Sequence, residues 1–299
     1  MGSNFEFGVV NTSESEAHKF IDLGIAEVQR LEDLLTEFNE ASVTCQLNRD
    51  AYASEVVVPE EVFELLERSI QLSKLTQGYF DITVGPLKKL YQFKNKTFTL
   101  PKKTEVKNQL KKVGYQYISL RSDSQAVRFR RKEMKLSFAA VGKGYAADAV
   151  KKKWQELGLQ SGYINASGDL TAFGCNHHNE PWRIAISDPD IPANSLLHIP
   201  LDNSSIATSG DYEQHLIHEG KRYSHNLNPK TGFPVQGIKS VSVCSPSAEL
   251  SDALATAVHA MGVDNGLSLI NQLPKTHVVI IDTNNQIHFS KDLAYEAVS

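Results

Sequence analysis

The spacing of apolar residues along the chain predicts five helices. Phe20, Ile21 and other apolar residues recur at helical spacing between Ser13 and Asn39, and Ser13 is followed three positions later by Glu16, as in a capping box. A second helix begins with proline in its first turn, where this residue is favoured. The predicted helices cover 13–39, 59–75, 249–262 and 263–272, and one more follows the 139–148 segment and ends near Gly158.

Shorter apolar runs predict strands, at 117–120, 127–130, 134–138, 162–166, 170–173, 182–187, 196–201, 205–208, 240–245, 277–281 and 286–290. These runs come in clusters instead of alternating strictly with helices, which favours an α+β fold over a doubly wound parallel sheet. Gly142-Lys143-Gly144 lacks the third glycine and the preceding apolar strand of a dinucleotide-binding fingerprint, so a Rossmann fold is not indicated.

Composition excludes several classes of protein. The 299 residues carry 31 Lys+Arg and 35 Asp+Glu, and the net charge of −4 gives no basic footprint for nucleic acid. No apolar run reaches the roughly 18 to 20 residues of a membrane span. No secretory leader is visible in 1–10, which favours the cytoplasm; a preceding leader would instead indicate a periplasmic or membrane-anchored protein. The lysine-rich segment 94–112 is interpreted as an exposed insertion.

The three cysteines, Cys45, Cys175 and Cys244, are far apart and show no metal-binding spacing, so they are interpreted as small buried apolar residues. Around Lys143, two glycines open a predicted helix, whose N-terminus and nearby ammonium group suit a phosphate. An ordinary tight turn with a solvated lysine is the alternative interpretation.

Two further segments contain candidate catalytic or metal-binding residues. His225 is the one histidine set among Pro/Gly turns, and it follows a small-hydroxyl segment that includes Thr208; it is either a proton shuttle or a structural histidine. Asp252 and Thr256 are four residues apart on a predicted helix, so both side chains project from one face. A carboxylate and a hydroxyl suit Mg²⁺, although a helix-capping Asp with a back-bonded Thr would show the same pattern.

Together these segments resemble the motifs of the ApbE family, the FAD:protein FMN transferases. TQGYFDITVGP at 76–86 resembles the family's TGGxFDxTVGPL, GKGYAAD at 142–148 its AKGYAVD, and NASGD at 165–169 its NxGGD. TSGDY at 208–212, the segment 225–234 and DALAT at 252–256 resemble TSGxY, HxxxPxTGxP and DALxT, and the initial MGS resembles MGT. The motifs follow the family's order from Met1 to about Gly262.

The resemblance implies an α+β fold of mixed, mostly antiparallel sheets with packed helices, built as a single domain over 1–299 or as two subdomains, with FAD in a central cleft. It implies Mg²⁺-dependent transfer of FMN from FAD to a Thr hydroxyl of an acceptor flavoprotein, with release of AMP. The metal ligands would be the backbone carbonyl of Ala140 and the side chains of Asp252 and Thr256, and His225 would help to activate the acceptor hydroxyl. Contacts to FAD would come from Met1, Phe38, Tyr79, Phe80, Asp81, Ser137, Lys143, Thr208 and Leu227.

Three departures from the family pattern stand out. Ser137 occupies a position that is usually Asp, Ser167 replaces the first glycine of the GGD motif, and Phe38 occupies a position that can be Tyr. None of them removes an implied metal ligand, so activity is expected. Two alternatives keep the same site: an FAD pyrophosphatase that gives FMN and AMP, and a flavin-binding protein without turnover.

Overall fold

The computed structural model describes residues 2–10, 12–91, 100–210, 215–218 and 221–297 of the chain. Within it the chain forms two compact units. Unit 1 comprises Met1–Glu32, Val141–Tyr212 and Gly237–Ser299, and unit 2 comprises Asp33–Ala140 and Glu213–Gln236. Helix α1 (Glu14–Leu35) begins in unit 1 and ends in unit 2.

Unit 1 is built on a seven-stranded sheet in which all neighbouring strands are antiparallel. The strand order is β1 (Phe5–Val9), β5 (Gly162–Ala166), β6 (Asp169–Phe173), β9 (Ser205–Gly210), β12 (Ile238–Ser245), β13 (His277–Asp282) and β14 (Ile287–Phe289). Strands that are consecutive in the sequence are therefore not always paired in the sheet. At its centre, β9 pairs with β6 on one side and with β12 on the other, although these strands are far apart in the sequence.

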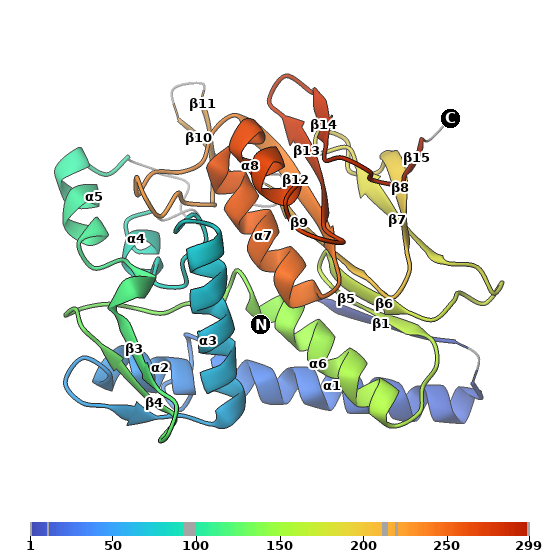
Figure 1. Ribbon diagram of the computed structural model, residues 1–299, viewed down its shortest axis with the longest axis horizontal. Coiled ribbons are helices and arrows are strands. Elements are labelled where there is room, and N and C mark those ends of the chain that lie inside the picture. The colour runs from blue at the N-terminus through green and yellow to red at the C-terminus, as the bar shows by residue number, and fades with distance from the viewer. Residues whose placement is uncertain (1, 11, 92–99, 211–214, 219–220, 298–299) are drawn as a thin grey trace. The chain divides into compact units, whose positions relative to one another are not determined.

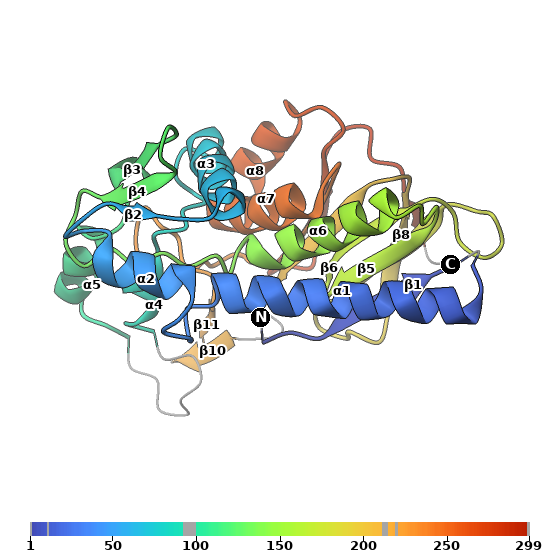
Figure 2. The ribbon, with the colours of Figure 1, turned by 90° about the horizontal axis from the view of Figure 1, so that it is seen from below.

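Helices α6 (Gly142–Glu156), α7 (Ala248–Met261) and α8 (Val263–Ile270) cover one face of this sheet (Figure 1). Val241 and Val243 of β12 pack against Leu254 and Val258 of α7 in one apolar cluster. The first part of α1 runs beside α6 (Figure 2), where the indole nitrogen of Trp154 donates a hydrogen bond to the carbonyl oxygen of Phe20 over 2.7 Å.

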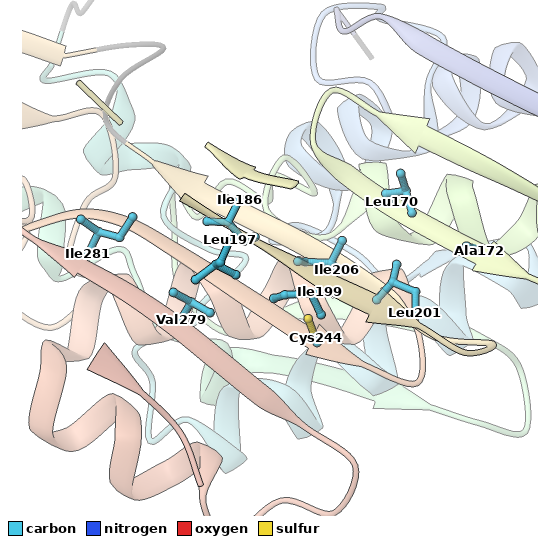
Figure 3. Close-up of a cluster of buried hydrophobic side chains, with 10 residues drawn as sticks. All are labelled: Leu170, Ala172, Ile186, Leu197, Ile199, Leu201, Ile206, Cys244, Val279 and Ile281. Atoms are coloured by element: carbon cyan, nitrogen blue, oxygen red, sulfur yellow. The ribbon is translucent and has the colours of Figure 1, made fainter. Parts of the chain in front are cut away.

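A second, three-stranded sheet covers the other face, in the order β15 (Glu296–Ala297), β8 (Ser195–Leu201) and β7 (Trp182–Ser187). Its Ile186, Leu197 and Ile199 form a buried cluster with Ile206 of β9 and Cys244 of β12 (Figure 3). Because side chains alternate along a strand, the two clusters assign each position of β9 and β12 to one of the two faces.

Unit 2 is the smaller of the two, and none of its described strands is longer than four residues. It contains α2 (Val43–Asp50), α3 (Glu60–Leu75), α4 (Gly85–Lys88), α5 (Lys103–Leu110), the 3₁₀ turn Tyr115–Tyr117, and the antiparallel sheet β2 (Val56–Val57), β4 (Ala126–Phe129), β3 (Ile118–Arg121). A hairpin of β10 (His215–His218) and β11 (Lys221–Ser224) completes it. Leu87, Tyr91 and Val106 share a buried cluster with Leu227.

The structure confirms the α+β fold with antiparallel sheets, and β5 and β7 have the predicted bounds. The strand predicted at 134–138 is wrong: apart from one isolated bridge between Val84 and Lys135, these described residues are not paired in a sheet. Part of the predicted insertion, 94–99, lies outside the described residues. Its other part forms α5, whose Val106 is 1% exposed, so this helix contributes to the core.

In the part of the chain that the structure describes, no helix has the length and apolar character of a membrane span.

Candidate functional site

The first turns of α6 and α7 lie against each other in unit 1. A Cβ atom at Gly144 would lie 2.2 Å from the carbonyl oxygen of Ala248, so only glycine permits this close approach. The glycine that the sequence suggested for approach to a ligand thus serves the contact between two helices.

Each of these helices supplies a carboxylate to the N-terminus of the other. Asp148 of α6 accepts hydrogen bonds from the backbone N–H groups of Ala248 (3.0 Å) and Glu249 (2.8 Å). In return, Asp252 of α7 accepts a longer one, 3.4 Å, from the backbone N–H of Gly144. Unpaired N–H groups and the helix dipole favour negative charge at both places, so the arrangement holds α6 and α7 in register.

A second buried carboxylate lies beside Asp252. Asp169, at the start of β6, forms a 2.6 Å ion pair with the ammonium group of Lys143 and also hydrogen-bonds Asp252. Burial and the neighbouring charge of Asp169 raise the pKa of Asp252 well above its usual range, while Lys143 and the Gly144 N–H act in the opposite direction. We call Lys143, Asp169 and Asp252 the carboxylate pair cluster.

The carboxylate pair cluster sets two carboxylates against one ammonium group. When both carboxylates are ionised, one negative charge remains in a buried place, where it needs a proton or a cation. Thr256 lies one turn after Asp252 on the same side of α7 and is partly exposed. Among the described residues no group of three or more His, Cys, Asp and Glu side chains is gathered to hold a metal. One carboxylate and a hydroxyl, with the negative charge of a second carboxylate beside them, fit Mg²⁺ best, because this ion keeps waters and phosphate oxygens as its other ligands.

In unit 2, Asp81 lies in a hydrogen-bond network that fixes the segment after α3. One carboxylate oxygen accepts from the N–H (2.8 Å) and hydroxyl (2.7 Å) of Thr83, and the other accepts from the N–H of Tyr115 (2.9 Å). Burial raises the pKa of Asp81, although these bonds act to lower it. The network shows that Asp81 orders the loop; its contact with flavin stays a prediction.

Ser137 lies in a second cluster of unit 2. Its hydroxyl accepts a 2.9 Å hydrogen bond from the ammonium group of Lys88 and donates one of 3.4 Å to Glu37. Lys88 exposes part of its side chain to solvent, but the protein around the ammonium group lowers its pKa, and the charge of Glu37 offsets part of this effect. We call Lys88, Ser137 and Glu37 the serine cluster.

The loop after β11 carries the predicted histidine. His225 is half-buried, and Leu227 packs into the core beside Leu87. The side-chain oxygen of Asn228 accepts a 2.9 Å hydrogen bond from the N–H of Lys230, which fixes the turn. The Lys230 ammonium group lies over the ring of Tyr79, 4.4 Å from its centre. The structure therefore brings Tyr79 and the loop of His225 together in unit 2.

The remaining predicted residues lie in varied surroundings. Met1 lies outside the described residues, Phe38 is 91% exposed and Phe80 is 1% exposed. Ala140 is the last residue of the first segment of unit 2. Thr208 hydrogen-bonds Ser242 over 2.8 Å. The metal and flavin contacts of these residues stay predictions.

Sequence reasoning gave Asp169 no role, although its NASGD segment was noted. The sequence offered one signal, an acidic residue directly after Ser167 and Gly168. In the structure both of these residues have positive φ, so the acid follows a tight turn. What could not be read was that β6 places this acid beside α6 and α7.

Comparison with known proteins identifies the family. The profile of the ApbE family matches residues 1–280, so the chain belongs to the ApbE family. It is 28% identical over 288 residues to the FAD:protein FMN transferase of Haemophilus influenzae, covering 93% of this chain and 82% of the relative. It is 31% identical over 233 residues to that of Chlamydia pneumoniae, covering 77% and 72%.

Solved structures agree with this family. The ApbE protein of Thermotoga maritima superposes with a TM-score of 0.88 at 27% identity, covering 97% of this chain and 94% of the other. The flavinyl transferase ApbE of Pseudomonas stutzeri, in its apo form, gives a TM-score of 0.86 at 27% identity, covering 97% and 92%. The ApbE-like fold expected from the motifs is therefore confirmed.

Proposed function

We propose that this chain is an enzyme that transfers FMN from FAD to a Thr hydroxyl of an acceptor protein and releases AMP. The observation that carries the proposal is the carboxylate pair cluster, in which Asp169 and Asp252 share a buried place with Lys143. The names of the relatives support FAD as the donor and a protein as the acceptor.

Two of the three implied metal ligands lie in unit 1, and the third, the backbone carbonyl of Ala140, lies in unit 2. Asp252 and Thr256, with the backbone carbonyl of Ala140, would hold Mg²⁺, and Asp169 adds negative charge beside Asp252. When bound, Mg²⁺ neutralises charge on the diphosphate and on the departing phosphate of AMP. Phosphoryl transfer needs such charge neutralisation and positioning more than covalent help. Lys143 pairs with Asp169, and its ammonium group would also attract the diphosphate of a bound FAD.

Unit 2 would supply flavin recognition and proton transfer. Tyr79 offers an aromatic ring, and the network of Asp81 fixes the loop that carries it. In the transfer, a bond forms between the acceptor Thr oxygen and the phosphorus of the FMN half, and the bond from that phosphorus to the AMP oxygen breaks. His225 would take the proton of the Thr hydroxyl.

The proposal is tested with purified protein, FAD, Mg²⁺ and an acceptor that carries the Thr-containing flavinylation motif. We expect covalent flavin fluorescence on the acceptor and an equal amount of AMP, both abolished by EDTA and by replacing the acceptor Thr with Ala. AMP formed at the same rate without acceptor would instead show FAD hydrolysis, and stoichiometric FAD binding without AMP would show a binding protein.

A further inference from the structure

The two faces of β9 show which hydroxyl of the TSG segment lies on the side of α7. Ile206 belongs to the cluster beneath the three-stranded sheet (Figure 3), and Thr208, two residues later, shares that face. Ser209 is paired with Val241, which packs against α7. Ser209, and not Thr208, therefore points to the helix that carries Asp252 and Thr256.

On α7, His259 meets this hydroxyl. Nδ1 of His259 lies 3.3 Å from Oγ of Ser209. His259 is 0% exposed. Burying an imidazole there costs free energy unless its nitrogens are hydrogen-bonded, so the contact with Ser209 is part of what stabilises this position.

The same side of α7 also carries the implied metal ligands. Asp252, Thr256 and His259 are spaced by four and three residues, so they follow one line along the helix. With a rise of 1.5 Å per residue, His259 lies about 4–5 Å beyond Thr256 along the axis. FAD is longer than this distance of about 4–5 Å, so a molecule whose diphosphate is held near Thr256 is long enough to reach Ser209. Ser209 is half-buried, so part of its surface is open to a ligand.

We propose that Ser209 is a further binding residue for the oxygen atoms of the dinucleotide next to the metal-bound diphosphate, and that His259 is the positioning residue that holds its hydroxyl. This inference rests on the proposed function, because it takes FAD as the ligand. A hydroxyl whose position is fixed by a buried partner loses little rotational freedom when it binds, which favours affinity.

A double-mutant cycle on FAD binding tests the pair. Ser209→Ala and His259→Leu are each expected to weaken FAD binding in the presence of Mg²⁺ about tenfold, the size of one hydrogen bond to a polar ligand. If His259 acts through Ser209, the double variant binds no more weakly than either single variant. His259→Asn, whose amide can lie where Nδ1 lies, restores binding, whereas His259→Gln does not.

Ser290→Ala is the matched control, since it removes a buried hydroxyl that accepts a 2.9 Å hydrogen bond from the N–H of Val278 on β13, a strand that does not pair with β9, and it is expected to bind FAD like the wild type. Thermal unfolding of every variant identifies losses that are due to stability alone, and the comparison of Asn with Gln remains decisive if His259→Leu does not fold. Unchanged FAD binding in Ser209→Ala, or additive losses in the cycle, would overturn the inference. Failure of the wild type to bind FAD would contradict the proposed function itself.

Discussion

The carboxylate pair cluster of unit 1 and the serine cluster of unit 2 hold one ammonium group each, but they differ in charge balance. Lys143 faces two carboxylates, Asp169 and Asp252, whereas Lys88 faces one carboxylate, Glu37, through a neutral hydroxyl. The first cluster therefore has a negative charge in excess when fully ionised, and the second is neutral. Only the first has a structural reason to take up a cation.

The buried environment makes this difference matter. Coulomb interactions between charges are several times stronger in a protein interior than in water, so an uncompensated carboxylate is costly there. The raised pKa of Asp252 reflects this cost, and the lowered pKa of Lys88 reflects the same physics for a cation. The carboxylate pair cluster is therefore stabilised by an added cation, whereas the charges of the serine cluster already balance.

The largest effect is expected from removing the central carboxylate of unit 1. Asp252→Ala should abolish flavin transfer at any Mg²⁺ concentration, because the implied metal would lose its one carboxylate ligand. AMP release and acceptor fluorescence measure the loss, and circular dichroism checks the fold. Asp264→Ala, the same change at an exposed position of α8, is the control and should be fully active. Normal transfer by Asp252→Ala would refute the metal assignment.

A smaller effect is expected from neutralising the second carboxylate. Asp169→Asn keeps the shape of the side chain but leaves Lys143 facing a single carboxylate, as Lys88 does in unit 2. A residue that supports a metal ligand typically contributes ~10- to 100-fold to metal affinity or activity. We expect the Mg²⁺ concentration for half-maximal transfer to rise by that factor, while kcat at saturating Mg²⁺ changes less. An unaltered Mg²⁺ titration would show that Asp169 has only a structural role.

These two predictions depend on residues that the sequence revealed to different degrees. Asp252 and Thr256 were found because helical spacing alone places them on one face, and α7 indeed begins at Ala248. Asp169 and Ser209 were not found, because their place depends on the order in which β6, β9 and β12 pair. Strand order is set by long-range packing, which no local pattern of residues encodes.

The fold shows the same limit. Helix α2 was missed because Thr44 and Leu47 are its only buried residues, too few for an apolar period, although Ser42 caps it. The predicted strand at 134–138 has the right alternation, since Met134, Leu136 and Phe138 are buried, but no strand pairs along it. Burial alternation therefore predicts an extended segment, whereas a strand also needs a partner.

A third prediction concerns the pH dependence of stability and Asp148. The hydrogen bonds to its carboxylate come from backbone N–H groups, whereas Asp252 has the carboxylate of Asp169 beside it. Burial raises its pKa to about 6 from the usual 3.8, although the N–H groups of Glu249 and Ala248 counteract this. Between these values the folded protein binds more protons than the unfolded chain, so this contribution destabilises the protein as pH rises through about 4 to 6. The pKa difference corresponds to about 3 kcal/mol.

The measurement is the free energy of unfolding by urea between pH 4 and pH 7, for the wild type and for Asp148→Asn. The variant cannot titrate at this position, so its stability relative to the wild type should rise with pH across this window, even though its NH₂ group faces one of the two N–H donors and lowers its stability at every pH. Carboxyl NMR shifts of Asp148 give its pKa directly. A stability difference that does not change with pH would show that the hydrogen bonds from α7 outweigh burial and hold this pKa near its usual value.

The smallest effect is expected from Ser137→Asp, which gives the serine cluster the charge pattern of unit 1. The new carboxylate would lie where Lys88 already donates a 2.9 Å hydrogen bond, so it would have a cation as partner and would not be an isolated buried charge. Glu37 lies on the other side of the hydroxyl, and its like charge limits the gain. Because the family usually has Asp at this position and the resemblance implies that it contacts FAD, we expect FAD binding at fixed Mg²⁺ to tighten, by no more than about fivefold, in the range of a single partly exposed ion pair. Ser137→Asn separates the added volume from the added charge and should not tighten binding.

Replacing Glu37 by Gln in the Ser137→Asp background restores one carboxylate per ammonium group and should increase the gain in FAD affinity. If Ser137→Asp weakens FAD binding while Ser137→Asn does not, FAD binding requires a serine cluster without excess negative charge. The two clusters would then differ in function: the carboxylate pair cluster needs its excess negative charge, and the serine cluster needs to be neutral.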